Sequence, residues 1–229
     1  FRAAPARVEP VEEQPAPAAT IDGFLADWGK RKIVTVELDP PRGLDCARVL
    51  TGSRALKDAG ADAINLAENP MARVRMGNIA LGSRIQREVG IEVIVHITCR
   101  DRNLLGLQSE LLGASLLGIR SILAVTGDPA RLGDQAGASS VFDLNSFGLI
   151  KLLSDLNNGV NGQGNPIGGS TGFTIGCAFN PNNPKMEAQV ARLAKKAACG
   201  ARFAQTQPLY DVARLDEMLE LTSHLGLPI

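Results

Sequence analysis

The segment VTVELDPPRG, residues 34–43, is the most informative stretch of this chain. Its alternating β-branched residues predict a strand, and Pro40 and Pro41 end that strand because proline donates no backbone hydrogen bond. Glu37 is therefore expected at the carboxyl end of a strand, beside a stiff turn. Ligands of α/β proteins bind outside the carboxyl ends of parallel strands, so Glu37 is a candidate catalytic acid or base. The alternative is a structural role, in which Glu37 caps the turn or pairs with Arg42.

Outward from this segment, the chain repeats a short apolar strand, a turn and an amphipathic helix. Strands are predicted at residues 33–38, 63–67, 92–98, 121–126, 173–179 and 202–206, and helices at 45–59, 75–89, 104–117, 147–157, 186–198 and 212–225. Alternation with a period of about 30 residues is typical of parallel strands that are joined by helices.

Two architectures fit this alternation, an open doubly wound sheet and a (β/α)8 TIM barrel. No GxGxxG sequence follows the first strand, which removes the best signature of a dinucleotide-binding open sheet. The regular period favours the barrel. Since six strands are predicted and residues 226–229 look like the opening of a seventh, we expect an α/β barrel that is truncated after about six βα units.

The first 19 residues differ in composition from the rest. They are rich in Pro, Ala and Glu and lack apolar periodicity, so we predict a linker or tail at 1–19 and the barrel at 20–229. A helix is expected to start at 20–22, and residues 23–28 should pack their apolar side on the domain. Because the chain starts with Phe and no signal segment follows, we expect a piece of a longer, cytoplasmic protein.

The composition argues against several classes of protein. The 24 basic and 24 acidic residues balance, so neither nucleic acid nor anionic lipid is an expected partner. No apolar run reaches the roughly 18 residues of a membrane span. The four cysteines are scattered without a CxxC pair, which favours reduced, buried thiols over a disulfide or metal site. No HExxH, Walker or GxSxG sequence occurs, and no metal is expected.

Polar residues gather at the predicted strand ends, a pattern typical of the mouth of a barrel. They are Glu37; Glu68 and Asn69; His96, Thr98 and Cys99; Thr126, Gly127 and Asp128; Asn180, Asn182 and Asn183; and Gln205, Thr206 and Gln207. A lone histidine in an apolar strand can also be a core residue, and Asp128 can be an ordinary turn residue. Because Gln205 and Gln207 are two residues apart around Thr206, at least one of the two glutamines is expected to be structural.

Five segments in order resemble the methylenetetrahydrofolate reductase family, a family of flavin-dependent (β/α)8 barrels. They are Val36-Glu37 with Pro40-Pro41-Arg42, His96-Ile97-Thr98-Cys99, Gly127-Asp128-Pro129, Leu193–Gly200 and Ala204–Asp211. The likeness runs from about Ile33 to the end of the chain. Residues 143–147 and the Pro/Glu-rich leader resemble one branch, in which a cobalamin-independent homocysteine S-methyltransferase domain precedes the reductase. That resemblance implies such a domain upstream.

The resemblance implies an oxidoreductase of one-carbon and methionine metabolism that reduces 5,10-methylenetetrahydrofolate to 5-methyltetrahydrofolate. FAD would be the cofactor, NADH or NADPH the co-substrate, and the protein a homo-oligomer. In this family the residue matching Glu37 protonates N10 of the folate, and that matching Asp128 holds the pterin and stabilises the cationic intermediate. Gln207 would contact the folate, which leaves Gln205 structural. The positions implied to contact FAD are His96, Thr126, Gly127, Asp128, Ser146, Phe179, Asn183 and Lys196.

The chain also departs from the family pattern. Thr126 stands where arginine is frequent, Asn183 where histidine is frequent and Phe179 where tyrosine is frequent, and residues 67–69 do not align with those that usually touch flavin and nicotinamide. These departures leave two sources of electrons open, NAD(P)H and a partner subunit, because some relatives receive electrons through partner subunits. Two further hypotheses stay open: a flavin-free, pterin-binding methyltransferase barrel and a non-catalytic partner subunit.

Overall fold

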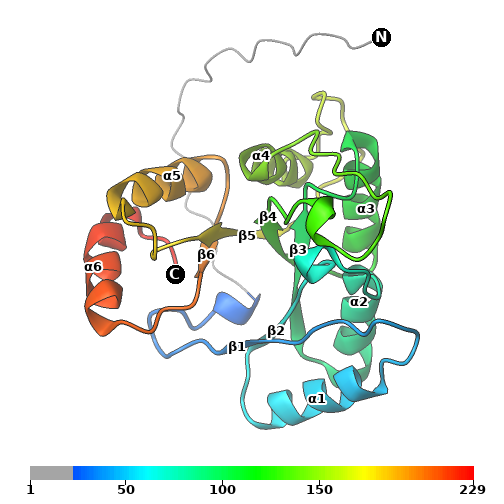
Figure 1. Cartoon of the computed structure of the whole chain (residues 1–229), viewed down its shortest axis with the longest axis horizontal. Helices are drawn as coiled ribbons and strands as arrows, with labels where there is room; N and C mark the ends of the chain where they lie inside the picture. The colour runs from blue at the N-terminus through cyan, green and yellow to red at the C-terminus, as the bar shows by residue number, and fades with distance from the viewer. Residues whose placement is uncertain (1–22) are drawn as a thin grey trace.

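The structure is a computed structural model that describes residues 23–229, so the predicted linker and the helix start at 20–22 lie outside the described residues. Six parallel strands form one sheet in the order β1 to β6, and helices connect them (Figure 1). The strands are β1 Thr35–Glu37, β2 Ala63–Leu66, β3 Glu92–Thr98, β4 Ser121–Val125, β5 Thr174–Phe179 and β6 Phe203–Thr206. The α-helices are α1 Ala47–Asp58, α2 Asn78–Val89, α3 Leu104–Leu116, α4 Ser146–Asn157, α5 Met186–Ala198 and α6 Val212–Thr222. Short 3-10 helices are η1 Gly23–Leu25, η2 Pro70–Ala72, η3 Ala130–Leu132 and η4 Ser223–Leu225.

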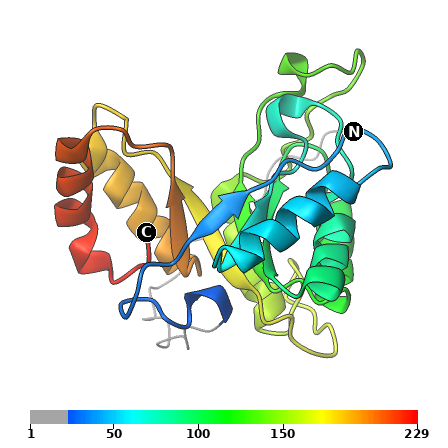
Figure 2. The ribbon, with the colours of Figure 1, turned by 90° about the horizontal axis from the view of Figure 1, so that it is seen from below.

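The sheet curls into a half-barrel with the helices on its outer side (Figure 2). Its strands follow one another in sequence order, whereas a doubly wound sheet reverses direction at a switch point. The curl brings β6 back toward β2, and Gln205 Nε2 donates to Asn65 Oδ1 at 2.8 Å across the interior. After α6 the chain returns beside β6, where Ala204 N donates to Pro228 O. The predicted barrel of six units is confirmed.

Apolar side chains fill both sides of the sheet. The larger core lies between strands and helices, and a smaller one fills the interior with Phe24, Leu25, Ala63, Ile94, Leu123 and Phe203. The rings of Phe24 and Phe203 meet edge-on with centroids 5.3 Å apart, so η1 covers the amino-terminal end of the interior. Gly176 on β5 makes room for this contact, since a Cβ there would lie 2.2 Å from the Phe203 ring. The predicted packing of 23–28 is confirmed for Phe24 and Leu25, whereas Trp28 is exposed.

The observed ends of several elements differ from the predicted ones. β1 is shorter than 33–38, and β2 and β4 end one residue early. α2 begins at Asn78 instead of residue 75, because polar contacts hold the preceding residues in a loop. Arg75 N donates to Asn69 Oδ1 at 2.9 Å, and Met76 N donates to Pro41 O at 2.8 Å. The β1–α1 and β2–α2 loops are thereby tied together at the barrel mouth.

The four cysteines all lie in the described part of the chain and are free thiols, three of them buried. Between residues 23 and 229 no helix combines the length and apolar character needed to cross a membrane. Within the same range, His, Cys, Asp and Glu side chains form no group of three or more suited to a metal ion.

Candidate functional site at the barrel mouth

Glu37 ends β1, as predicted, and borders a cavity of about 350 Å³ inside the half-barrel. Thr35, Asn65, Gln205 and Thr206 also line this cavity. Burial raises the pKa of Glu37 above its ordinary value, and the neighbouring negative charge of Asp39 raises it further. A carboxyl group with a raised pKa keeps its proton to higher pH, which suits a general acid.

Asn65 centres a polar layer beside Glu37, its partner in the β1–β2 register. Asn65 Nδ2 donates to Thr35 Oγ1 at 3.0 Å, and Asn65 Oδ1 accepts from Gln205 Nε2. His96 Nε2 lies 3.2 Å from the same Oδ1, so His96 can donate there as the Nε2-protonated tautomer. Burial lowers the pKa of His96 to about 4, which leaves the ring neutral at neutral pH. The layer therefore presents uncharged hydrogen-bonding groups next to an acid.

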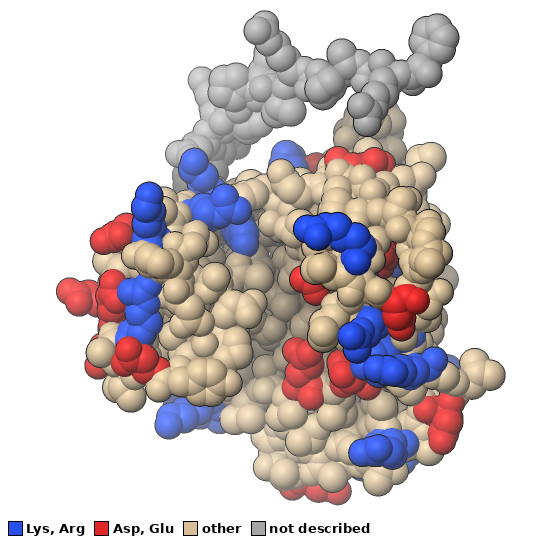
Figure 3. Space-filling view, in the orientation of Figure 1, with Lys and Arg blue, Asp and Glu red and all other residues tan. Residues whose placement is uncertain are grey.

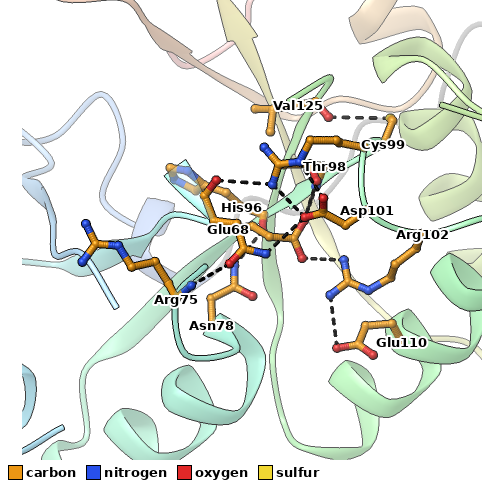
Figure 4. Close-up of polar contacts among 12 residues, drawn as sticks. Glu68, Arg75, Asn78, His96, Thr98, Cys99, Asp101, Arg102, Glu110 and Val125 are labelled. Carbon is orange, nitrogen blue, oxygen red and sulfur yellow. Dashed lines mark hydrogen bonds and ion pairs between the residues drawn. The ribbon is translucent and has the colours of Figure 1, made fainter. Parts of the chain in front are cut away.

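Glu68 is a buried carboxylate that ties the ends of β2 and β3 together (Figure 4). It accepts from Thr98 N at 2.7 Å, from Thr98 Oγ1 at 2.8 Å and from Arg102 Nη1 at 2.5 Å. The side chain of Asn78 reinforces the link by donating to the carbonyls of Leu66 and His96. With these partners, Glu68 is best explained as a structural anchor of the mouth.

Arg100 is almost fully buried, with 2% of its surface exposed, and joins three mouth loops. Its guanidinium pairs with Asp101 at 2.6 Å and donates to the backbone carbonyls of Asn69 and Asp128, both at 3.3 Å. Burial favours the neutral form of Asp101, but hydrogen bonds from Arg100 and Asn69 outweigh burial and lower its pKa. Arg100 thus fixes the backbone from which the Asp128 carboxylate projects.

The β2–α2 loop beside Arg100 is strained. Asn69, Met71 and Ala72 have φ angles of 41°, 56° and 57°, a region that non-glycine residues rarely adopt. Such strain persists only where surrounding contacts enforce it, and it concentrates at functional sites. The Arg100 and Arg75 hydrogen bonds to Asn69 are contacts of this kind.

The turn Thr126–Asp128 follows β4 and packs closely against β3. Gly127 has φ +86°, and a Cβ there would lie 2.9 Å from Thr98 Cβ, so this turn requires glycine. The carbonyl of Thr126 accepts from Cys99 N at 3.2 Å. Burial, with the nearby charge of Glu68, raises the pKa of the Cys99 thiol to about 11, so this thiol stays protonated. Asp128 itself is exposed, with its carboxylate available to a ligand.

A basic site lies where α5 meets the amino-terminal end of α4. Ser146 is the buried first residue of α4, and Arg192 and Lys196 lie 5.3 and 5.8 Å from the centroid of the next residue's ring, Phe147. Lys196 is buried and donates to Ala178 O at 2.6 Å. Burial lowers the pKa of Lys196, and Arg192 lowers it further. Figure 3 shows basic side chains over α5 on the same face as the hollow of the half-barrel. Two cations beside a helix N-terminus are suited to a phosphate group.

Gln207 is exposed beyond β6 and borders an open cavity of about 600 Å³ with Asn180, Asn182 and Tyr210. Asn182 Nδ2 donates to Pro208 O at 2.9 Å, which ties the β5–α5 loop to the β6–α6 loop.

Two of the predicted flavin contacts, Asn183 and Phe179, have local structural explanations. Asn183 Oδ1 accepts from Lys185 N at 2.9 Å within its own loop. Phe179 is packed into the core between sheet and helices with 3% exposure, so the fold accounts for this aromatic ring without a ligand. Contact of either residue with flavin stays a prediction.

A sequence model described as methylenetetrahydrofolate reductase matches residues 24–229. The chain belongs to the methylenetetrahydrofolate reductase family. The resemblance drawn from five motifs is thereby confirmed at the level of the family.

Solved structures with the same fold are distant in sequence. An uncharacterized protein from Clostridium thermocellum, described as binding two copies of 5-methyl-5,6,7,8-tetrahydrofolic acid, is 13% identical with a TM-score of 0.56, over 84% of this chain and 59% of that one. The tryptophan synthase α-subunit of Pyrococcus furiosus is 14% identical with a TM-score of 0.55, over 84% and 74%. Deoxyribose phosphate aldolase from Aeropyrum pernix is also 14% identical, with a TM-score of 0.55, over 85% and 73%. At these identities the likeness shows the fold alone, and this chain spans about three fifths of the Clostridium protein.

In this member of the methylenetetrahydrofolate reductase family, the predicted site residues fall into separate groups around one mouth. Glu37 and His96 lie at the interior polar layer around Asn65. Thr126, Gly127 and Asp128 form the turn after β4, and Gln207 lies beyond β6. Ser146 and Lys196 lie at the basic site. Sequence reasoning did not identify Asn65, Arg100 or Arg192. A polar residue inside the apolar run AINLA was a signal for Asn65, and Arg100 lies two residues after the end of β3.

Proposed function

We propose that this chain catalyses the flavin-dependent reduction of 5,10-methylenetetrahydrofolate to 5-methyltetrahydrofolate, with NADH or NADPH as the electron donor. The family match over residues 24–229 is the observation that carries the proposal. A structural neighbour that binds 5-methyltetrahydrofolic acid supports a folate as the ligand.

Glu37 is the proposed general acid. Protonation of N10 turns that nitrogen into a leaving group, so the five-membered ring opens to a 5-iminium cation. The burial and the Asp39 charge that raise the pKa of Glu37 keep the proton available for this step. Asp128 is proposed to lie against the pterin, where its carboxylate stabilises the positive charge of the opened ring.

FAD is the proposed cofactor, supported by the two cations beside the amino-terminal end of α4, and when bound it would supply the hydride that reduces the exocyclic methylene. Lys196 and Arg192 would hold the pyrophosphate beside Ser146 at the start of α4. His96, which is neutral, would face the flavin ring together with the Thr126–Gly127 turn. Because Thr126 carries no charge, this chain would lack the ionic flavin contact that an arginine at this position would make.

Replacing Glu37 by glutamine tests the acid role, because glutamine is nearly isosteric and cannot donate that proton. We expect Glu37→Gln to lower the rate of methylenetetrahydrofolate reduction by about 10²- to 10⁴-fold while NAD(P)H still reduces the flavin at the wild-type rate. Stopped-flow absorbance of the flavin measures both half-reactions separately. Equal losses in the two would show that Glu37 is structural.

Asp39→Asn is the matched control for the electrostatic argument. Removing the neighbouring negative charge should lower the pKa of Glu37. The decline of folate reduction with rising pH should then begin at lower pH, with the rate at acidic pH kept. An unchanged pH profile would show that the charge of Asp39 does not set the pKa of the catalytic acid.

A flavin-free barrel that transfers a methyl group from methyltetrahydrofolate is the second candidate, and the folate-binding structural neighbour favours it. Colourless purified protein that binds methyltetrahydrofolate equally well with and without added FAD would support this candidate. A yellow protein whose colour is bleached by NADH or NADPH would support the reductase.

A further inference from the structure

Asn69 lies where loops of the barrel mouth meet. Its side chain forms hydrogen bonds in two directions, since Oδ1 accepts from Arg75 N at 2.9 Å and Nδ2 donates to Asp101 Oδ2 at 3.1 Å. Its backbone carbonyl accepts from Arg100 Nη2 at 3.3 Å. Figure 4 shows Arg75 on one side of these contacts and Asp101 on the other. One asparagine therefore joins the β2–α2 loop to the loop that follows β3.

The partners of Asn69 allow only one orientation of its amide. A backbone N–H can only donate and an ionised carboxylate can only accept, so Arg75 N must face Oδ1 and Asp101 must face Nδ2. Asp101 is itself held in place, because Arg100 donates to both of its carboxylate oxygens, at 2.6 and 2.7 Å. Rotation of the amide by half a turn would break both side-chain hydrogen bonds.

The backbone of Asn69 is left-handed, with φ 41° and ψ 59°. Glycine enters this region freely and asparagine and aspartate do so occasionally, whereas other residues meet a steric clash at Cβ. Glycine has no side chain to form the two hydrogen bonds, and aspartate would place a second carboxylate against Asp101. Asparagine is thus the residue type that suits both the backbone and the partners at this position.

The contacts of Asn69 continue through Arg75 to the segment that directly follows Glu37. Arg75 Nη1 donates to Pro40 O at 3.4 Å, and its Nη2 lies 3.5 Å from Asp39 Oδ2. Because Asn69 Oδ1 holds the backbone of Arg75, it also sets where this guanidinium meets the β1–α1 loop. The position of Glu37 at the end of β1 therefore depends on Asn69.

On its other side, Asn69 is connected to the turn that carries Asp128. The guanidinium of Arg100 donates to Asn69 O through Nη2 and to Asp128 O through Nη1, both at 3.3 Å. Arg100 is 2% exposed, so its surroundings leave little room for a different side-chain position. One residue is thereby linked to the backbone beside each of the two proposed catalytic carboxylates.

We propose that Asn69 is a positioning residue that fixes where Glu37 and Asp128 lie relative to each other. The inference rests on the proposed function, in which these two carboxylates act on one folate. A displacement of about 1 Å in a reacting group can lower a rate about 10²-fold, so a residue that acts only through its neighbours can still govern the reaction.

Replacing Asn69 by glycine tests this role, because glycine keeps the left-handed backbone and removes both side-chain hydrogen bonds. We expect Asn69→Gly to lower kcat for methylenetetrahydrofolate reduction about 10- to 100-fold, with KM for the folate within about twofold of the wild-type value. Asn161→Gly is the matched control and should keep the wild-type kcat. Asn161 Oδ1 also accepts from two backbone N–H groups, those of Gln163 and Asn165, but in the loop between α4 and β5 at the amino-terminal end of the barrel. A wild-type kcat in Asn69→Gly, or a rise in KM as large as the fall in kcat, would overturn the proposal.

Combination with Glu37→Gln distinguishes positioning from a general loss of structure. If Asn69 acts in part by placing Glu37, Asn69→Gly should lower the rate by a smaller factor in the Glu37→Gln background than in the wild type, since one of the two positioned groups is already lost. Stopped-flow absorbance of the flavin measures the folate half-reaction in all four proteins. Equal factors in the two backgrounds would contradict the link from Asn69 to Glu37.

Amide hydrogen exchange of the whole 229-residue chain tests the anchoring without turnover. In Asn69→Gly the amide of Arg75 loses its acceptor, so exchange at Arg75 and Met76 should be about tenfold faster, and Asn161→Gly should leave both amides unchanged. An active wild type whose exchange at these two amides does not respond to Asn69→Gly would overturn this inference alone. A wild-type chain that does not reduce the folate would overturn the proposed function as well.

Discussion

His96 is a part-buried base whose surroundings keep it neutral. Its pKa in the folded chain is about 4, against an ordinary value near 6.5, because burial opposes the charged form. Between these two pH values the unfolded chain binds more protons than the folded chain. The free energy of unfolding therefore falls as the pH is lowered from about 6.5 to about 4. The total decrease over this range is about 3 kcal/mol.

Replacing His96 by glutamine removes the titrating group and keeps a polar side chain beside Asn65. We expect His96→Gln to reduce the loss of stability between pH 7 and pH 4, measured by urea unfolding at several pH values. The decisive quantity is the dependence on pH, because the substitution can also change stability at neutral pH. His224→Gln is the control, since His224 is exposed and is the only other histidine of the chain. If both variants keep the wild-type dependence on pH, other groups cause it.

The basic site depends on how two elements meet, the amino-terminal end of α4 and one side of α5. Consecutive lysines on α5 provide a direct comparison, because Lys195 is exposed whereas Lys196 is buried next to Phe147. Lys196→Met should weaken FAD binding about 10- to 100-fold, the usual size of a lost charge-assisted contact. Quenching of flavin fluorescence on titration of the protein measures this affinity without turnover. Lys195→Met should bind as the wild type does, and equal weakening in both variants would contradict a specific contact by Lys196.

At the scale of elements, the alternation of apolar strands and helices predicted the order and direction of the sheet. It also placed Glu37 at a strand end, because prolines stop β1 in any surroundings. The start of α2 was predicted too early, since the hydrogen bonds that hold residues 75 and 76 in the loop come from Asn69 and Pro41. Local periodicity carries no information about such contacts between loops.

The same limit applies to the candidate site. Each strand-end residue was visible in the sequence, but the links between the strand ends were not. Arg100 reaches the carbonyls of Asn69 and Asp128, which lie 31 and 28 residues away in the chain. In the sequence, Asn65 is a polar residue that interrupts an apolar strand. Only the curled sheet shows that its hydrogen-bond partners lie on β1, β3 and β6.

At the scale of the whole molecule, the bond between Asn65 and Gln205 joins strands near opposite ends of the sheet. The two residues are 140 positions apart, and their amides meet in the interior at 2.8 Å. Most contacts of a parallel barrel join neighbouring strands, whereas this bond forms only when the sheet is curled. Its coupling energy therefore reports on closure of the half-barrel.

A double-mutant cycle with Asn65→Ala and Gln205→Ala measures that coupling. We expect the two losses of unfolding free energy to differ from additivity by about 1 kcal/mol, since both variants remove the same part-buried hydrogen bond. Gln205→Ala with Gln86→Ala is the control pair, because Gln86 on α2 donates to Gly118 O and shares no partner with Gln205. These two losses should add. Additive losses for Asn65 and Gln205 as well would mean that β6 does not close onto β2 in solution, and the cavity beside Glu37 would then be open along that whole side.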